Sequence, residues 1–253
     1  MKTLAVMSGK GGVGKSTIAA NLAALISKEH KVGILDTDFH GPTIPKILDI
    51  EEEALLTTPD GEIEPVKYNE NLQAVSIDLM QQEEDQPTIW RGPLKMKVIK
   101  EFSNEIHWDE STEYLIIDLP PGTGDEPLSV AQEFQGIDGA IIVTTPQDVA
   151  LKSVRKSVNF AKRIDLEVIG VIQNMNKLKC PNCGEEIKIF GSGGGVEMSK
   201  ELDIPFLGSL PLDPEIMQSG EKGKPFVEED TKLKESMETI FNNVKDILGE
   251  KNK

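Results

Sequence analysis

One short segment constrains the fold of this chain more than any other. Residues 9–17 read Gly-Lys-Gly-Gly-Val-Gly-Lys-Ser-Thr and fit the pattern G-x-x-x-x-G-K-S/T. The segment follows an apolar run at 3–7 and precedes apolar residues at helical spacing between 18 and 26. This is the strand, loop and helix context that a phosphate-binding loop requires. The sequence therefore predicts an α/β protein with a phosphate site at one edge of its sheet.

The residue types in this loop suit a bound nucleotide. Glycines let the backbone form a nest of N–H groups, and the N-terminus of the following helix adds positive potential. Lys15 is expected to reach the outer phosphates, and the Ser16 hydroxyl is expected to ligate Mg²⁺. The predicted nucleotide contacts come from Gly11, Gly12, Val13, Gly14, Lys15, Ser16 and Thr17.

Short apolar runs alternate with helical patterns along the rest of the chain. Runs of Val, Ile and Leu are typical of parallel strands that are buried on both faces. The predicted strands are 3–7, 32–35, 114–117, 140–143, 168–172 and 206–207. We expect one P-loop NTPase domain over residues 1–253, with a mostly parallel twisted sheet and helices on both faces.

Two segments interrupt this alternation. Residues 50–85 contain two alternating stretches, 63–68 and 72–77, which predict a β-hairpin insertion. Residues 177–195 contain both cysteines and a glycine-rich run at 191–195. That composition predicts a metal-binding loop without regular structure.

Carboxylates follow two of the predicted strands directly. Asp36 and Asp38 come after the second strand, and Asp118 comes after the third. Carboxylates at strand ends can hold Mg²⁺ or its waters and can orient a nucleophilic water toward a γ-phosphate. An isolated aspartate in such a position is more often a turn or helix-capping residue. Asn174 ends a later strand, where its amide could read the edge of an adenine base.

The chain contains two cysteines, Cys180 and Cys183, in a C-x-x-C knuckle. Pro and Gly in such a knuckle turn both sulfurs toward one metal. Two thiolates do not complete a four-thiolate site, so a two-fold dimer is the simplest completion. The residues alone favour zinc and iron-sulfur equally; a reversible disulfide is a further reading, and a thioredoxin-like redox motif is the least favoured. His30, His40 and His107 lack ligand spacing to the pair, which indicates surface or capping roles.

Composition excludes several other classes of protein. The formal net charge of −16 argues against nucleic-acid binding, because phosphate contacts need a surplus of Lys and Arg. No apolar stretch approaches the roughly 20 residues that span a bilayer, so we expect no membrane partner. The N-terminus carries no secretory h-region, and we expect a cytoplasmic protein.

Lys10 points to a particular subclass of phosphate loops. Together with 36–43, 90–93, 118–125, 144–147 and 180–184, it resembles the deviant Walker A ATPases of the MinD/ParA type, and within them the Mrp/ApbC iron-sulfur cluster carriers. The resemblance implies that Lys10 reaches the nucleotide of the other subunit, with Lys10, Lys15 and Asp38 as catalytic residues and Asp38 positioning or activating the water.

The same resemblance assigns roles to the remaining candidates. It implies that Asp118 acts through a Mg²⁺-bound water, with Asp36 a further contributor near the metal. Gly122 would be a backbone donor that faces the γ-phosphate. Asn174 and the backbone around Pro211 would contact the base.

The resemblance also implies the function. The chain would bind and hydrolyse ATP as a homodimer, hold a labile [4Fe-4S] cluster between Cys180 and Cys183 of two subunits, and transfer it to apo-proteins. The alternative is a MinD/ParA-type spatial-organisation ATPase with a structural zinc site. A membrane-binding tail would be a basic amphipathic helix. Residues 232–253 instead mix Lys with Asp and Glu, which argues against such a tail.

Overall fold

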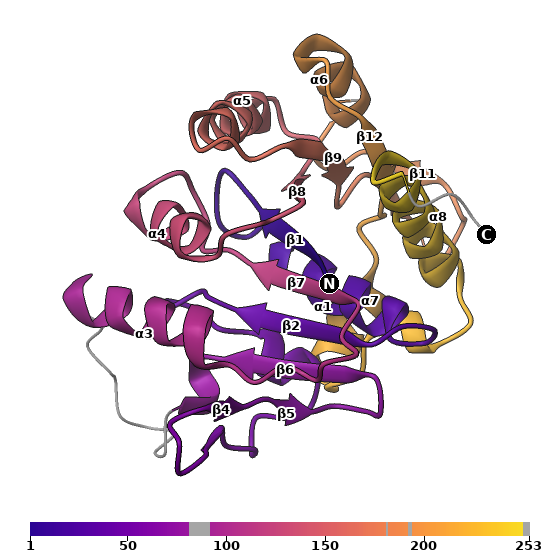
Figure 1. The fold of residues 1–253 in the computed structure, drawn as a ribbon. Helices are drawn as coiled ribbons and strands as arrows, with labels where there is room; N and C mark the ends of the chain where they lie inside the picture. The colour runs from indigo at the N-terminus through magenta and orange to yellow at the C-terminus, as the bar shows by residue number, and fades with distance from the viewer. Residues whose placement is uncertain (81–91, 181, 192–193, 250–253) are drawn as a thin grey trace.

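A computed structural model describes residues 1–80, 92–180, 182–191 and 194–249, with the backbone alone at 148–151. Eight strands form one sheet in the order β12, β9, β8, β1, β7, β2, β6, β5 (Figure 1). Their bounds in that order are Phe206–Ser209, Val168–Gln173, Gly139–Thr144, Lys2–Met7, Tyr114–Asp118, Val32–Asp36, Leu72–Ser76 and Val66–Lys67. Every neighbouring pair is parallel except β5 with β6. The predicted α/β class with a mostly parallel sheet is confirmed.

Helices cover both faces of this sheet (Figure 1). One face packs on α1 (Lys15–Ile26), α2 (Ile44–Ile47) and α8 (Lys232–Ile247), with α7 (Pro214–Glu221) against α2. The other face packs on α3 (Gly92–Glu105), α4 (Asp125–Glu133), α5 (Asp148–Arg163) and α6 (Gly194–Leu202). Two 3₁₀ turns, η1 (Asp78–Met80) and η2 (Phe226–Glu228), complete the helical elements of the described chain.

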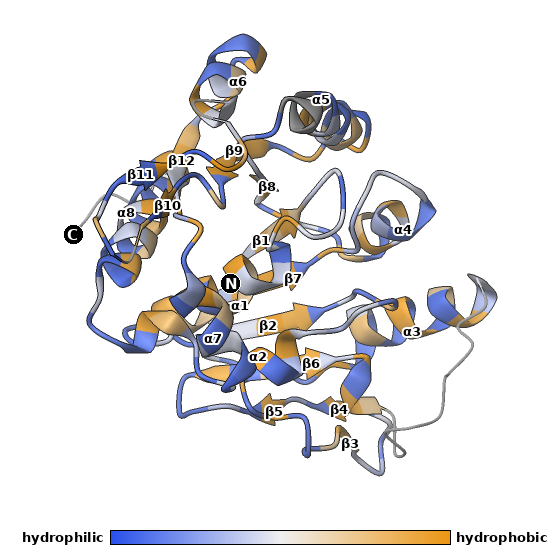
Figure 2. Ribbon diagram, turned by 180° about the vertical axis from the view of Figure 1, so that it is seen from behind, coloured by the Kyte–Doolittle hydropathy of each residue, from blue (hydrophilic) through white to orange (hydrophobic). Residues whose placement is uncertain are grey.

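Side chains of the central strand alternate between these two layers. Leu4 and Val6 belong to the core under α1 and α8, whereas Ala5 and Met7 belong to the core under α3, α4 and α5. This period of two is the geometry of an extended strand. Figure 2 shows hydrophobic residues concentrated on the strands and hydrophilic ones on the outer sides of the helices. Among the described helices, none is both long and apolar enough to cross a membrane.

The predicted hairpin insertion needs a correction. A hairpin is present, because Val66 and Lys67 of β5 pair antiparallel with β6. However, β6 also pairs in parallel with β2 along its whole length, so this arm belongs to the main sheet and is not an insertion. The start of the predicted first arm, β4 (Ile63–Glu64), pairs instead with β3 (Leu56–Thr57). Residues 81–85 of the predicted insertion lie outside the described residues.

The prediction that 177–195 lacks regular structure was wrong. Two short strands, β10 (Leu178–Lys179) and β11 (Glu186–Ile187), pair antiparallel on either side of the cysteines. Helix α6 begins at Gly194, inside the glycine-rich run. A Cβ on Gly195 would lie 2.4 Å from Gln173 Oε1, so the glycine permits close packing of α6 against β9.

Candidate functional site

The phosphate loop connects β1 to α1 at the carboxyl edge of the sheet. Gly14 is the N-cap of α1 and has a left-handed backbone with φ of 83°. A Cβ there would lie 2.2 Å from Asn174 Nδ2, so both the turn and its neighbour require glycine. Among the described residues, no side chain caps α1. The first N–H groups of the helix are thus available to an anionic ligand.

Lys15 and Asp118 form a buried ion pair at the base of this loop. Lys15 Nζ donates to Asp118 Oδ1 at 2.6 Å, and their side chains are 6% and 0% exposed. Burial raises the pKa of Asp118, although the charge of Lys15 opposes the shift. Asp118 Oδ2 is buried and has no partner among the described residues. This free oxygen and the Ser16 hydroxyl supply the hard oxygen donors that suit Mg²⁺ and its waters.

Asp36 organises the segment that follows β2. Its Oδ1 accepts from the Asp38 amide at 3.1 Å, and its Oδ2 accepts from Thr43 N at 3.2 Å, Ile44 N at 3.3 Å and Ser76 Oγ at 3.3 Å. Burial, then the charge of Asp118, raises the pKa of Asp36 to about 7, despite the opposing amide bond. The carboxylate therefore holds the loop and the start of α2, beside its predicted contribution near the metal.

Asp38 and Gly122 lie in the two segments predicted to sense the γ-phosphate. Asp38 is 8% exposed, and its Oδ1 accepts from the His40 amide at 3.2 Å. Gly122 has φ of 94°, and its N–H donates to Ser8 O at 2.8 Å. The Gly122 amide would have to leave Ser8 before it could donate to a phosphate, so its predicted role stays a prediction.

A cavity of about 360 Å³ opens beside the phosphate loop. Its lining includes Gly14, Thr17, Asn174, Met175, Pro211 and Leu212, with α2 and α7 contributing Ile47, Ile216 and Met217. Asn174 Nδ2 donates to Val13 O at 2.9 Å, and its Oδ1 accepts from Met175 N at 2.9 Å. Asn174 thus holds the phosphate loop and lines the cavity, where a mainly apolar wall suits a nucleotide base.

Lys10 has a partner within its own chain. Its Nζ donates to Gln147 Oε1 at 2.8 Å, and its carbonyl accepts from Ser8 Oγ at 2.9 Å. Gln147 lies at the N-cap of α5, directly after β8. The sequence pattern does not show this contact, although Gln147 stands in one of the motifs that carry the resemblance. Trp90 and Arg91, from another of those motifs, lie outside the described residues.

The cysteines lie at the turn of the β10–β11 hairpin. Cys180 N donates to Glu185 O, and Gly184 N donates to Cys180 O, both at 2.9 Å. Cys180 is half-buried and Cys183 is exposed. Donation from the N–H groups of Cys183 and Asn182 lowers the pKa of the Cys180 thiol. Across the part of the chain that the structure describes, no group of three or more His, Cys, Asp or Glu could hold a metal ion.

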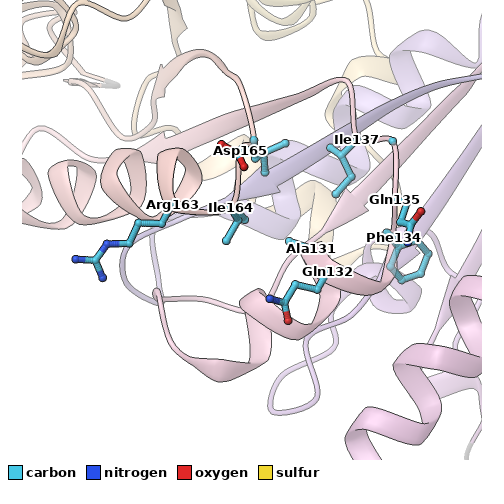
Figure 3. A pocket seen from close by; sticks show the side chains of 10 residues that line it. Ala131, Gln132, Phe134, Gln135, Ile137, Arg163, Ile164 and Asp165 are labelled. Atoms are coloured by element: carbon cyan, nitrogen blue, oxygen red, sulfur yellow. The ribbon is translucent and has the colours of Figure 1, made fainter.

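Another cavity has a volume of about 390 Å³, and Figure 3 shows the side chains that line it. Its lining comes from the end of α4 and the loop after it, and from the end of α5 and the loop after it: Ala131, Gln132, Phe134, Gln135, Gly136, Ile137, Arg163, Ile164, Asp165 and Leu166. These segments precede β8 and β9, so the cavity lies at the amino edge of the sheet. It contains none of the predicted site residues, which gather at the carboxyl edge instead.

The fold and the phosphate loop define the class of protein. The chain is a P-loop NTPase with a MinD-like fold. The MinD cell division protein of Aquifex aeolicus superposes with a TM-score of 0.68 at 20% identity, covering 100% of this chain and 99% of that one. At that identity the likeness shows the fold alone.

Sequence comparisons identify the family within this class. The family described as "NUBPL iron-transfer P-loop NTPase" matches residues 1–245. An iron-sulfur cluster carrier protein of Saccharolobus solfataricus is 46% identical, covering 88% of this chain and 75% of that protein. A cytosolic Fe-S cluster assembly factor, a NUBP2 homolog of Trichoplax adhaerens, is 44% identical, covering 88% of this chain and 85% of that protein. The chain therefore belongs to the Mrp/NUBP family of iron-sulfur cluster carrier P-loop NTPases.

A solved relative shows a nucleotide on this scaffold. The nucleotide-binding protein of Archaeoglobus fulgidus in complex with ADP is 37% identical to this chain. It superposes with a TM-score of 0.76, covering 88% of this chain and 86% of that one.

Proposed function

We propose that this chain binds and hydrolyses ATP and carries a [4Fe-4S] cluster, held between two copies of the chain, to apo-proteins. The observation that supports it best is the cysteine hairpin. It presents the chain's two cysteines together at a turn, with Cys183 exposed and the pKa of Cys180 lowered. Thiolates are the ligands of iron-sulfur clusters, and four are needed. Two chains related by a two-fold axis supply four.

The nucleotide chemistry uses the residues at the carboxyl edge. In the proposed ATP complex, the loop amides and Lys15 bind the outer phosphates, and Ser16 and Asp118 hold Mg²⁺ directly or through water. When bound there, Mg²⁺ would neutralise the charge that develops on the phosphates. Asp38 orients the attacking water, and the apolar cavity beside Asn174 and Pro211 takes the base.

The proposed dimer gives Lys10 a second partner. In the single chain Lys10 Nζ donates to Gln147. In the dimer the ammonium would leave Gln147 and contact the nucleotide of the other subunit. Recipient apo-proteins follow from the carrier role, and the cytosolic relative supports a cytoplasmic location.

Anaerobic reconstitution tests this proposal. The protein is incubated with iron, sulfide and a thiol reductant, and its absorption, iron content and mass in solution are measured. One [4Fe-4S] cluster per two chains is the expected result, followed by transfer to an apo-protein. A monomer that retains zinc and takes up no cluster would contradict the carrier function.

Asp38→Ala is expected to slow ATP hydrolysis by roughly 100-fold, because general-base or water-orienting groups contribute on that order. Nucleotide binding should stay within about twofold of wild type, since the phosphate loop is unchanged. Single-turnover hydrolysis and equilibrium binding of Mg-ATP measure the two quantities. Unchanged turnover would remove Asp38 from the mechanism.

A further inference from the structure

Lys95 occupies an unusual position for a lysine. It shares one face of α3 with Val98, Ile99 and Phe102, all of which are buried. The Lys95 side chain is itself only 10% exposed. A buried ammonium is costly unless it is paired and hydrogen-bonded, so the partners of Lys95 indicate the role of its charge.

The partners of Lys95 come from the predicted phosphate-sensing loop after β2 and from the first turn of α4, directly after the other such segment. Its Nζ donates to Glu126 Oε1 and lies 2.9 Å from His40 Nε2, to which it can also donate. His40 Nε2 lies 3.1 Å from Glu126 Oε1. The ammonium also lies 5.6 Å from the centre of the Phe39 ring. One buried cation therefore joins the loop after β2 to the first turn of α4.

Each partner of Lys95 is close to a group of the candidate site. The backbone amide of His40 donates to Asp38 Oδ1 at 3.2 Å. Glu126 is the second residue of α4, which directly follows the segment of Gly122. The contacts of Lys95 thus run through His40 to the carboxylate proposed to orient the attacking water.

Packing alone does not explain a lysine here. A Met or Leu would fill the space between α3 and α4 without the cost of a buried charge. What the ammonium adds is simultaneous hydrogen bonding to His40 and Glu126, two residues that lie far apart in the sequence. The hydrogen bond that Lys95 donates to Glu126 also holds the pKa of the Glu126 carboxyl low against the effect of burial, which keeps the ammonium and the carboxylate charged.

We propose that Lys95 is a positioning residue for ATP hydrolysis, which fixes His40, and through it Asp38, relative to the segment that follows β7. This inference deepens the proposed function and depends on the chain being an ATPase. It assigns no contact between Lys95 and the nucleotide. It therefore predicts an effect on turnover that is separate from nucleotide binding.

Steady-state hydrolysis by Lys95→Met tests the inference. The expected result is a kcat lower by roughly 10-fold to 100-fold, as small misplacements of catalytic groups produce, with KM and the dissociation constant for ATP within about twofold. Lys95→Arg, which retains the charge and the donors, should recover part of the loss. Lys97→Met is the matched control, because Lys97 lies on the same helix, is 71% exposed and pairs with Glu101.

Two further variants separate positioning from a folding defect. Glu126→Gln keeps the shape of the partner and removes its charge, and it should lower kcat in the same direction. Lys95→Met should cause no further loss in an Asp38→Ala background, because both changes act through one group. Thermal unfolding and ATP binding establish that each variant is folded.

The outcomes distinguish this inference from the proposed function. A wild-type protein that does not hydrolyse ATP would contradict both. If wild type hydrolyses ATP and both Lys95→Met and Glu126→Gln match its kcat, the positioning role alone is contradicted. If Lys95→Met lowers kcat in the Asp38→Ala background by as much as it does in wild type, the positioning role is also contradicted.

Discussion

Cys180→Ser is expected to reduce the iron bound after anaerobic reconstitution to background, at least about tenfold below wild type. Serine matches cysteine in shape, but its hydroxyl stays protonated at neutral pH and is a poor ligand for iron in a cluster. The N–H donors of Cys183 and Asn182 lower the pKa of the Cys180 thiol and so favour the thiolate that iron requires. Iron content and visible absorption measure the loss.

Cys180→Ser should affect cluster binding and leave nucleotide binding unchanged. ATP binding by Cys180→Ser is expected to stay within about twofold of wild type, because the phosphate loop is untouched. Glu185→Gln is the matched control on the same hairpin, since only the backbone carbonyl of Glu185 accepts from Cys180. Full iron loading of Cys180→Ser would show that the cysteine pair is not the cluster site.

Lys15→Ala is expected to weaken ATP binding by at least about 100-fold, or about 2.8 kcal/mol. The substitution removes the charge-assisted contact to the outer phosphates. It also leaves the buried carboxylate of Asp118 without the ammonium 2.6 Å away, so the pKa of Asp118 should rise further. Isothermal titration with Mg-ATP measures the affinity.

Stability should change with pH in a defined direction. The pKa of Asp118 is higher in the folded than in the unfolded state, so the folded state favours the protonated carboxyl. The free energy of unfolding therefore falls as the pH rises above the pKa that the carboxyl has in the unfolded state. The melting temperature of Lys15→Ala should therefore lie further below that of wild type at about pH 8 than at about pH 5. Lys97→Ala is the matched control, because Lys97 lies on α3 outside the cavity, is 71% exposed and pairs with Glu101. Equal losses of affinity in the two variants would contradict the role of Lys15.

The buried parallel strands were predictable because both of their faces are covered. Strand β8 is buried at all of its positions, and such strands are continuous runs of apolar residues. The place of β6 was not predictable in the same way. Alternation over 72–77 fits a hairpin arm, and nothing local shows that the other edge of the strand pairs with β2. Two-residue strands such as β10 and β11 are too short to leave a pattern.

The sequence indicated which residues gather at the site, but not how their side chains are engaged. The order of strand ends was enough to bring Asp36, Asp38 and Asp118 to the edge that carries Lys15. It could not show that Asn174 holds Val13, or that Lys10 is bound by Gln147. Those contacts depend on side-chain directions set by packing between distant segments.

The position of Lys95 leaves a signal in the sequence. Lys95 stands at helical spacing with Val98, Ile99 and Phe102, which places a charge in an apolar stripe. The glycine run predicts coil at the start of α6, whereas Gly194 and Gly195 are the first two residues of the helix. Gly195 is in fact required by the closeness of Gln173.

The central position of β1 has a consequence for synthesis on the ribosome. Its register partners include Tyr114 in β7 and Gly139 in β8, so neither neighbour exists when the phosphate loop first emerges. Long-range pairing of this kind makes folding slow and leaves strand edges open meanwhile. The cysteine hairpin is translated only after β8 is complete. The thiols therefore emerge once all three central strands are available, which shortens the time that they are exposed on an unfolded chain.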